Sequence, residues 1–433
     1  MVDIKAFSGY EIVGGGVCAA KGFKANGVCC GLAHKPLNKT EENSAIANNA
    51  LPENTKKKND LAAIYCEKEC AAAAVYTTNK VKGAPINVTK RNIENGYAKA
   101  VIVNSVNANC CNADGEEKAE RMCEILASEL NIDKRDVIVA STGVIGQVLP
   151  IEPIENAAKE LCEGLTEDGN ERACEAIMTT DTVKKQIAVR FKLGDRQVTL
   201  GGMLKGSGMI HPNMATTLTF ITTDCDIAPE YLQRALSENV KITLNMASVD
   251  GDTSTNDMVC VLASGLAQNK KINSENEDYE TFKNALYIVM LNLARMMARD
   301  GEGATKLIEC ICTGANDDET ARKVAKSVVC SSLFKSAIFG EDANCGRIFC
   351  AVGYSGGDFE VSDLNVAMAS KAGSIDVCKD GSVLEFDEEK AAKILAEEEI
   401  NIHVSVGSGL FSATAWGCDL TYDYVRINGD YRS

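Results

Sequence analysis

A turn rich in glycine and proline that leads directly into a threonine-rich run constrains this chain more than any other segment. Gly206, Gly208 and Pro212 punctuate the turn, and residues 218–224 are rich in β-branched side chains. Such a pattern predicts a turn followed by a strand. An ordinary turn and strand would account for these residues, so any chemical role needs further support from elsewhere in the chain.

The bond between Ala215 and Thr216, inside this segment, is a candidate for self-cleavage. The Thr216 hydroxyl would attack the Ala215 carbonyl, shift the acyl group from nitrogen to oxygen, and leave an ester that water hydrolyses. The new chain would begin with Thr216, whose free α-amine lies beside its own hydroxyl. That pair is an activated nucleophile with a built-in base, because an unperturbed α-amine titrates near about pH 8.

Several other segments share their residues with the motifs of one protein family, in the same order along the chain. They are residues 141–146, 179–182, 205–209, 248–257, 300–306, 339–344 and 428–433. With these segments the chain resembles the ornithine acetyltransferase family of arginine biosynthesis, also called glutamate N-acetyltransferase. The resemblance extends from about residue 16 to the last residue.

The resemblance implies an α/β fold, a layered α+β sandwich of mixed sheets packed with helices, related to that of N-terminal-nucleophile aminopeptidases. It also implies an α chain of residues 1–215 and a β chain of residues 216–433 with a smaller C-terminal subdomain. Two α and two β chains would assemble as a heterotetramer in the cytoplasm.

For the chemistry, the resemblance implies transfer of an acetyl group from N²-acetylornithine to glutamate through acetyl-Thr216. The Thr142 hydroxyl and the Gly143 N–H would form the oxyanion hole. The residues implied in substrate binding are Thr182, Lys205, Thr216, Glu302, Asn428 and Ser433. No cofactor or metal is implied, and acetyl-CoA stays open as a second acetyl donor.

Two alternatives remain at this point. The first is a hydrolase or aminopeptidase on the same fold, in which water accepts the acyl group. The second is a binding protein that keeps the fold and is never cut. Dependence of product release on glutamate separates the first from a transferase, and cleavage of the chain separates the second.

Composition limits the partners. The net charge of −16 argues against binding nucleic acid or an anionic membrane surface, since both attract basic patches. The N-terminal residues lack the basic stretch and apolar core of a signal peptide, and no apolar run reaches the length of a membrane span. The partners expected are therefore small molecules and further copies of the chain.

Nineteen cysteines and the pair Asp250 and Asp252 raise the question of metal binding. The cysteines are odd in number and show no repeated CxxC spacing, so most are expected to be small apolar residues of a reduced interior. The two aspartates lack the calcium-loop pattern and are expected to stabilise a turn.

The apolar periodicity predicts alternating strands and helices around these motifs. Strands are expected at residues 98–104, 136–141, 186–191, 197–204, 307–312, 347–353, 363–369, 401–407 and 413–427. Helices are expected at residues 117–130, 153–165, 229–246, 278–299, 316–333 and 388–399. The polar stretch 35–58 reads as a surface insertion.

Three positions depart from the family pattern: Val106, where the family usually has glycine, Cys345, where an aromatic residue is common, and Gly429, where alanine or serine is commoner. None of them coincides with the implied nucleophile or oxyanion hole. The departures therefore bear on substrate range more than on the type of reaction.

Overall fold

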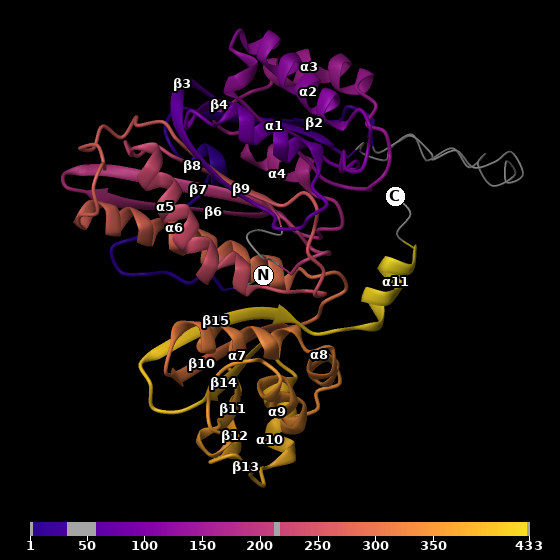
Figure 1. The fold of residues 1–433 in the computed structure, drawn as a ribbon, viewed down its shortest axis with the longest axis vertical. Helices are drawn as coiled ribbons and strands as arrows, with labels where there is room; N and C mark the ends of the chain where they lie inside the picture. Colours follow the sequence, from indigo (N-terminus) through magenta and orange to yellow (C-terminus); the bar gives the residue numbers. More distant parts are fainter. Residues whose placement is uncertain (1–2, 33–57, 212–216, 431–433) are drawn as a thin grey trace, which may run out of the picture.

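The computed structural model describes residues 3–32, 58–211 and 217–430, which form a larger body and a smaller lobe (Figure 1). Most of the predicted insertion 35–58 falls outside the described residues, as do Ala215, Thr216 and Ser433. The two lobes confirm a layered α/β architecture of mixed sheets and helices.

A nine-stranded sheet organises the larger body. Its order is β1-β6-β7-β8-β9-β3-β4-β5, and β2 pairs with β3 beside this path. The strands are β1 (Glu11–Val13), β2 (Phe23–Val28), β3 (Leu61–Tyr76), β4 (Tyr97–Asn104), β5 (Val137–Ser141), β6 (Lys185–Leu193), β7 (Arg196–Lys205), β8 (Leu218–Thr223) and β9 (Met258–Ala263). The helices are α1 (Ala84–Asn92), α2 (Gly115–Leu130), α3 (Glu152–Glu163), α4 (Asn170–Ile177), α5 (Pro229–Ile242) and α6 (Glu277–Arg299).

Helices cover both faces of this sheet: α4 packs on one face, and α1, α2, α3, α5 and α6 pack on the other (Figure 1). Successive residues of β8 point to opposite faces, as a pleated strand requires. Ile221 belongs to the core shared with α5 and α6, whereas Phe220 packs in the core that contains α4. Burial on both faces explains why β8 carries apolar and β-branched residues without a polar side.

Strands β7 and β8 are antiparallel neighbours, and Lys205 at the end of β7 pairs with Leu218 at the start of β8. The connection between them, residues 206–217, contains the predicted cleavage site. Each strand has a further partner, β6 for β7 and β9 for β8. A cut in this connection would therefore leave the sheet hydrogen bonding intact.

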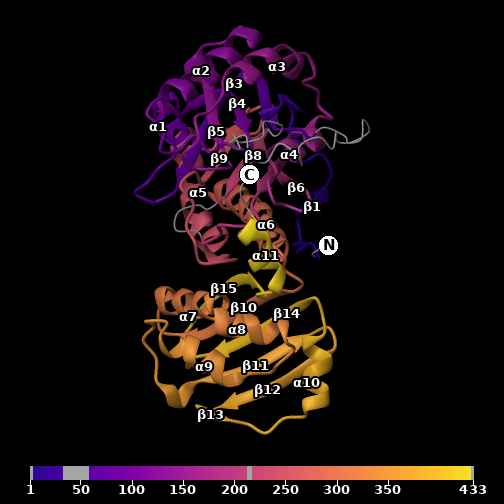
Figure 2. The ribbon, with the colours of Figure 1, turned by 90° about the vertical axis from the view of Figure 1, so that its right-hand side faces the viewer.

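A six-stranded sheet of order β13-β12-β11-β14-β10-β15 builds the smaller lobe. Its strands are β10 (Leu307–Ala315), β11 (Asn365–Ser370), β12 (Gly373–Lys379), β13 (Ser382–Val383), β14 (Glu399–Ser405) and β15 (Phe411–Cys418). Its helices are α7 (Asp318–Cys330), α8 (Ser332–Phe339), α9 (Cys345–Gly353) and α10 (Glu388–Leu395). A final helix, α11 (Tyr422–Asp430), returns toward the body and crosses the junction of the two lobes (Figures 1 and 2).

Two of the predicted strands are wrong. Residues 347–353 lie in α9, because Asn344 caps its start by accepting the Arg347 N–H at 3.2 Å and buried Ile348, Ala351 and Val352 share one helical face. The run was mistaken for a strand because its apolar residues are contiguous. The prediction for 413–427 holds only in its first part, since β15 ends at Cys418 and α11 follows.

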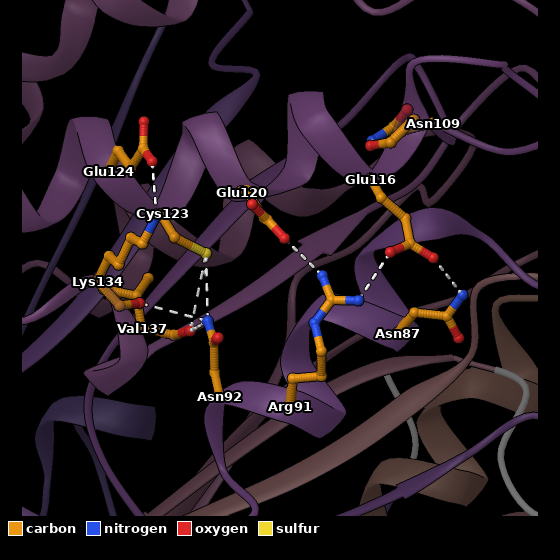
Figure 3. A network of polar contacts seen from close by, with 11 residues as sticks. Asn87, Arg91, Asn92, Asn109, Glu116, Glu120, Cys123, Glu124, Lys134 and Val137 are labelled. Carbon is orange, nitrogen blue, oxygen red and sulfur yellow. Dashed lines mark hydrogen bonds and ion pairs between the residues drawn. The ribbon is translucent and has the colours of Figure 1, made fainter.

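Polar contacts join α1 to α2 and to β5 (Figure 3). The Arg91 guanidinium donates to Glu116 at 2.7 Å and to Glu120 at 2.6 Å. Both pairs are about half exposed, so each contributes little to stability. The Asn92 amide donates at 2.8 Å to the Val137 carbonyl, which fixes α1 to the first residue of β5.

All nineteen cysteines lie in the described ranges as free thiols, and most are buried. The apolar role expected for most of them is confirmed. None of the helices within the described residues is long and apolar enough to span a membrane.

Candidate active site

A cavity of about 130 Å³ brings together residues from both sides of the predicted cleavage site. Five of the predicted site residues line it: Thr142, Gly143, Lys205, Glu302 and Asn428. The other lining residues are Ala108, Ile145, Thr179, Thr180, Gly208, Met209, Ile210, Thr217, Leu218, Ser254, Thr255, Asn256 and Asp257. Ala215, Thr216 and Ser433 lie outside the described residues, while Thr217 places the start of β8 at the cavity.

The loop that follows β5 carries Thr142 and Gly143, the two residues predicted to form the oxyanion hole, and both line the cavity. Gly143 adopts φ 133°, and a Cβ atom there would lie 2.0 Å from the Val106 carbonyl carbon, so only glycine fits. The Val144 N–H donates to the Val106 carbonyl at 2.9 Å and locks the loop in place. Neither the Thr142 hydroxyl nor the Gly143 N–H donates to another described residue.

Val106 itself adopts φ 84°, a left-handed conformation that is unusual for a β-branched residue. This is the position at which the resembling family usually has glycine. A valine in this conformation adds strain beside the Gly143 loop.

Asn256 ties the Gly143 loop to the neighbouring loop, and sequence reasoning did not single it out. Its side-chain amide donates to the Ser141 carbonyl at 2.9 Å and to the Ala108 carbonyl at 2.5 Å. The Thr255 hydroxyl donates to the Asn256 amide oxygen at 2.7 Å and fixes the orientation of the side chain. Residue 256 lies more than one hundred positions from these carbonyls, so only the fold reveals the contact.

Opposite charges lie in the same cavity. Glu302 is buried, and its carboxylate accepts the Asn428 amide at 2.7 Å. The absence of a side chain at Gly208 lets that carboxylate approach, because a Cβ atom there would lie 2.3 Å from the Glu302 carboxyl carbon. Lys205, at the end of β7, forms no ion pair within 4 Å to any described residue. The cavity can thus bind a molecule with one positive and one negative end.

A buried cluster of one lysine and two aspartates lies beside this cavity. The Lys185 ammonium contacts Asp181 at 2.7 Å and also pairs with Asp300. Asp181 accepts the Gly206 N–H at 2.8 Å, so the cluster holds the end of β7. Thr182 does not line the cavity; its N–H and hydroxyl donate to Asp300.

Burial opposes ionisation of Asp181, but Lys185 and Lys205 outweigh it and lower the pKa of this carboxyl to about 2.

We expect Lys185→Met to destabilise the protein by about 3–5 kcal/mol, because it leaves two buried carboxylates without their cation. Lys184→Met is the control, since Lys184 is partly exposed and pairs with Glu171 at the surface. Thermal unfolding should show a large loss of stability for Lys185→Met and a small one for Lys184→Met. Equal losses would contradict a stabilising role for Lys185.

Asp257 is a second acidic residue of the cavity that sequence reasoning did not identify. Burial raises its pKa well above the usual range, against the opposing effects of a Ser254 hydrogen bond and the Lys205 charge. One of its carboxyl oxygens has no hydrogen-bond partner in the described structure.

The residue that follows the predicted nucleophile is held firmly. The Thr217 hydroxyl lies 2.6 Å from the Thr219 hydroxyl in the interior, and the Thr217 carbonyl accepts the Met258 N–H at 2.8 Å. The Thr217 side chain is thus already engaged on the inner side of β8.

Comparisons with known proteins agree with one another. The model of the ArgJ family matches residues 47–433. The arginine biosynthesis bifunctional protein ArgJ 1 of Clostridium acetobutylicum is 50% identical over 377 residues, which are 87% of this chain and 92% of that protein. The arginine biosynthesis bifunctional protein ArgJ of Caldanaerobacter subterraneus is 44% identical over 424 residues, covering 98% and 100%. A solved structure of ArgJ from Bacillus halodurans matches 48% of this chain and 97% of its own, with 48% identity and a TM-score of 0.46.

Proposed function

The chain belongs to the ArgJ family, and we propose that it transfers an acetyl group from N²-acetylornithine to glutamate in arginine biosynthesis. The observation that carries the proposal is the single cavity that unites Thr142 and Gly143 with Lys205 and Glu302. N²-acetylornithine has a carboxylate for Lys205, a side-chain ammonium for Glu302, and an acetamide between them. The arrangement of charges in the cavity therefore fits the donor.

In the proposed mechanism the Thr216 hydroxyl attacks the acetyl carbonyl carbon while its own α-amine takes the proton. The Thr142 hydroxyl and Gly143 N–H stabilise the resulting oxyanion, with each donor contributing about 3–4 kcal/mol in comparable sites. The C–N bond then breaks, and ornithine leaves with the proton on its α-nitrogen. The α-amine of glutamate attacks the acetyl ester, which releases N-acetylglutamate and returns the proton to Thr216.

This mechanism requires cleavage between Ala215 and Thr216 by the route given above, since only a chain that begins at Thr216 has the α-amine. The pairing of β7 with β8 and of β8 with β9 supports a chain that stays folded after the cut. We propose chains of residues 1–215 and 216–433, two of each in a heterotetramer in the cytoplasm.

An assay of acceptor dependence tests the transferase against the hydrolase. Ornithine release from N²-acetylornithine should rise strongly when glutamate is added, with one N-acetylglutamate formed for each ornithine. Equal release without glutamate would favour the hydrolase. A single band on a denaturing gel, together with no release in either case, would favour an uncut binding protein.

The relatives' description as bifunctional supports acetyl-CoA as a second donor. Incubation with acetyl-CoA and glutamate, without acetylornithine, should then release free thiol and N-acetylglutamate in equal amounts. No thiol release, with normal transfer from acetylornithine, would restrict the protein to the first reaction.

Glu302→Gln should raise the KM for N²-acetylornithine more than it slows self-cleavage. Loss of the charge partner of an ammonium group costs on the order of 2–3 kcal/mol, or about 30- to 150-fold in KM. Glu163→Gln on α3 is the control, because Glu163 is exposed and, among the described residues, forms an ion pair only with Lys159. Unchanged kinetics for Glu302→Gln would show that this carboxylate does not contact the substrate.

A further inference from the structure

Residues 205–208 lie at both charged ends of the cavity. Lys205 supplies the positive charge, and the missing side chain of Gly208 leaves the space that the Glu302 carboxylate occupies. The distance between the two charges therefore depends on how residues 205–208 are aligned with the loop that contains Glu302.

Hydrogen bonds fix residues 206–210 at both ends. At the first end, the Gly206 N–H donates to the buried carboxylate of Asp181 at 2.8 Å. At the other end, the Asp250 carboxylate accepts the Met209 N–H at 2.6 Å and the Ile210 N–H at 2.8 Å. This segment is thus a fixed frame against which the neighbouring loop is placed.

Ser207 joins the frame to the loop that follows α6. Its hydroxyl donates to the Asp300 carbonyl at 2.6 Å, and its own carbonyl accepts the Glu302 N–H at 3.1 Å. Ser207 therefore bonds on both sides of Gly301. These two bonds determine the alignment of the segment that carries Lys205 with the loop that carries Glu302.

The hydroxyl of Ser207 is important because it is buried. The residue is 0% exposed, so its removal would leave the Asp300 carbonyl without this donor in a site that water does not reach. The Asp300 carboxylate is held separately, by Lys185 and by the Thr182 N–H at 3.1 Å. Loss of the hydroxyl should therefore release the backbone from Asp300 to Glu302 and leave the Asp300 side chain anchored.

We propose that Ser207 is a positioning residue that sets the separation of Lys205 and Glu302, and so the length of the donor that the cavity accepts. In N²-acetylornithine the α-carboxylate and the side-chain ammonium are the two ends to be matched, and a further methylene moves them apart. The identity of the donor rests on the function proposed above. The alignment of the two segments does not depend on that function.

Ser207→Ala tests the proposal with two donors, N²-acetylornithine and N²-acetyllysine, which is one methylene longer. The wild-type protein should prefer N²-acetylornithine. The variant should raise the KM for N²-acetylornithine about five- to ten-fold with little change in kcat, the effect of one lost hydrogen bond. The KM for N²-acetyllysine should rise less, so the ratio of kcat/KM for the two donors should fall. An unchanged ratio would overturn the proposal.

Ser264→Ala is the matched control. Ser264 is also buried, and its hydroxyl donates to the Lys21 carbonyl at 2.9 Å, but it does not line the cavity. The control variant loses the same kind of hydrogen bond and should keep both KM values close to wild type. The same fall in the donor ratio for Ser264→Ala would overturn the proposal, because a general loss of stability would then explain it.

Amide hydrogen exchange provides a measurement that needs no activity. Ser207→Ala should make exchange at the Glu302 N–H roughly ten-fold faster, because the loop is no longer held on both sides of Gly301. Unchanged exchange would overturn the alignment. A wild-type protein with no transfer from either donor would contradict the proposed function and leave this exchange result to decide the role of Ser207.

Gly208→Ala changes the same alignment from the side of the carboxylate. The added Cβ atom would lie 2.3 Å from the Glu302 carboxyl carbon and displace the end of that side chain, while both hydrogen bonds of Ser207 stay in place. The donor ratio should therefore fall with little change in exchange at the Glu302 N–H. This variant decides the proposal if Ser207→Ala does not fold, and an unchanged donor ratio would overturn it.

Discussion

Replacement of Gly143 with alanine should reduce kcat by about 100- to 1,000-fold, the loss found when an oxyanion donor is removed. A Cβ atom at this position would lie 2.0 Å from the carbonyl carbon of Val106 and 2.5 Å from the Asn107 nitrogen. Those atoms belong to backbone that is held by the hydrogen bond from Val144, so the loop at Gly143 must move instead. Its N–H would then point away from the developing negative charge. Single-turnover measurement of ornithine release separates this chemical step from substrate binding.

Gly146→Ala is the matched control for Gly143→Ala. Gly146 also has a left-handed φ, of 82°, but a Cβ atom there would have nothing within 4 Å. The control variant should lose roughly 1–2 kcal/mol of stability through backbone strain and keep most of its activity. If both variants lose activity equally, strain in the loop explains the result and the Gly143 N–H has no special role.

The comparison of the two glycines shows what the sequence can and cannot reveal. A strand that ends at a Thr-Gly pair predicts a turn, and β5 does end at Ser141. That the turn places Gly143 against Val106 depends on the parallel pairing of β4 with β5, which brings Asn104 beside Ser141. Pairing between distant strands leaves no local pattern, so this close approach needed the structure.

The helices and strands follow the same rule. α2, α6 and the hairpin of β6 and β7 were predicted because their apolar spacing is long and regular. β3 was not predicted, because its many alanines give no alternation, and it is buried over most of its length. α11 was predicted as a strand because its aromatic and branched residues favour strands, whereas a Thr421 hydroxyl at its start and contacts with the cavity favour the helix.

In the candidate site, some residues were identified from the sequence and others needed the structure. Lys205, Glu302 and Asn428 were identified through the family resemblance, and the structure brings them together in one cavity. Asn256 and Asp257 were not identified individually, since asparagine and aspartate beside a strand are common turn residues. Asn256 has carbonyl partners more than one hundred residues away, and Asp257 is buried; neither property is visible in the sequence.

Thr216→Ala should leave the chain uncut and inactive, because it removes both the hydroxyl and the only route to the new α-amine. Thr216→Ser keeps the hydroxyl but loses the methyl group that restricts χ1. We therefore expect slower self-cleavage and partial transfer. Denaturing electrophoresis should show one band for the alanine variant and two for the serine variant, and the glutamate-dependent assay should give the same order of activity.

Thr217→Ala is the control that distinguishes the two adjacent threonines. The Thr217 hydroxyl lies 2.6 Å from that of Thr219 inside the protein, so it is already engaged on the inner side of β8. Its loss should cost about 1 kcal/mol of stability, the usual value of a buried hydrogen bond, and leave cleavage and transfer close to wild type. N-terminal sequencing of the fragment that contains β8 should begin Thr-Thr-Leu. A fragment that begins Thr-Leu would move the nucleophile to Thr217, and a fully active Thr216→Ala protein would disprove the acetyl-threonine mechanism.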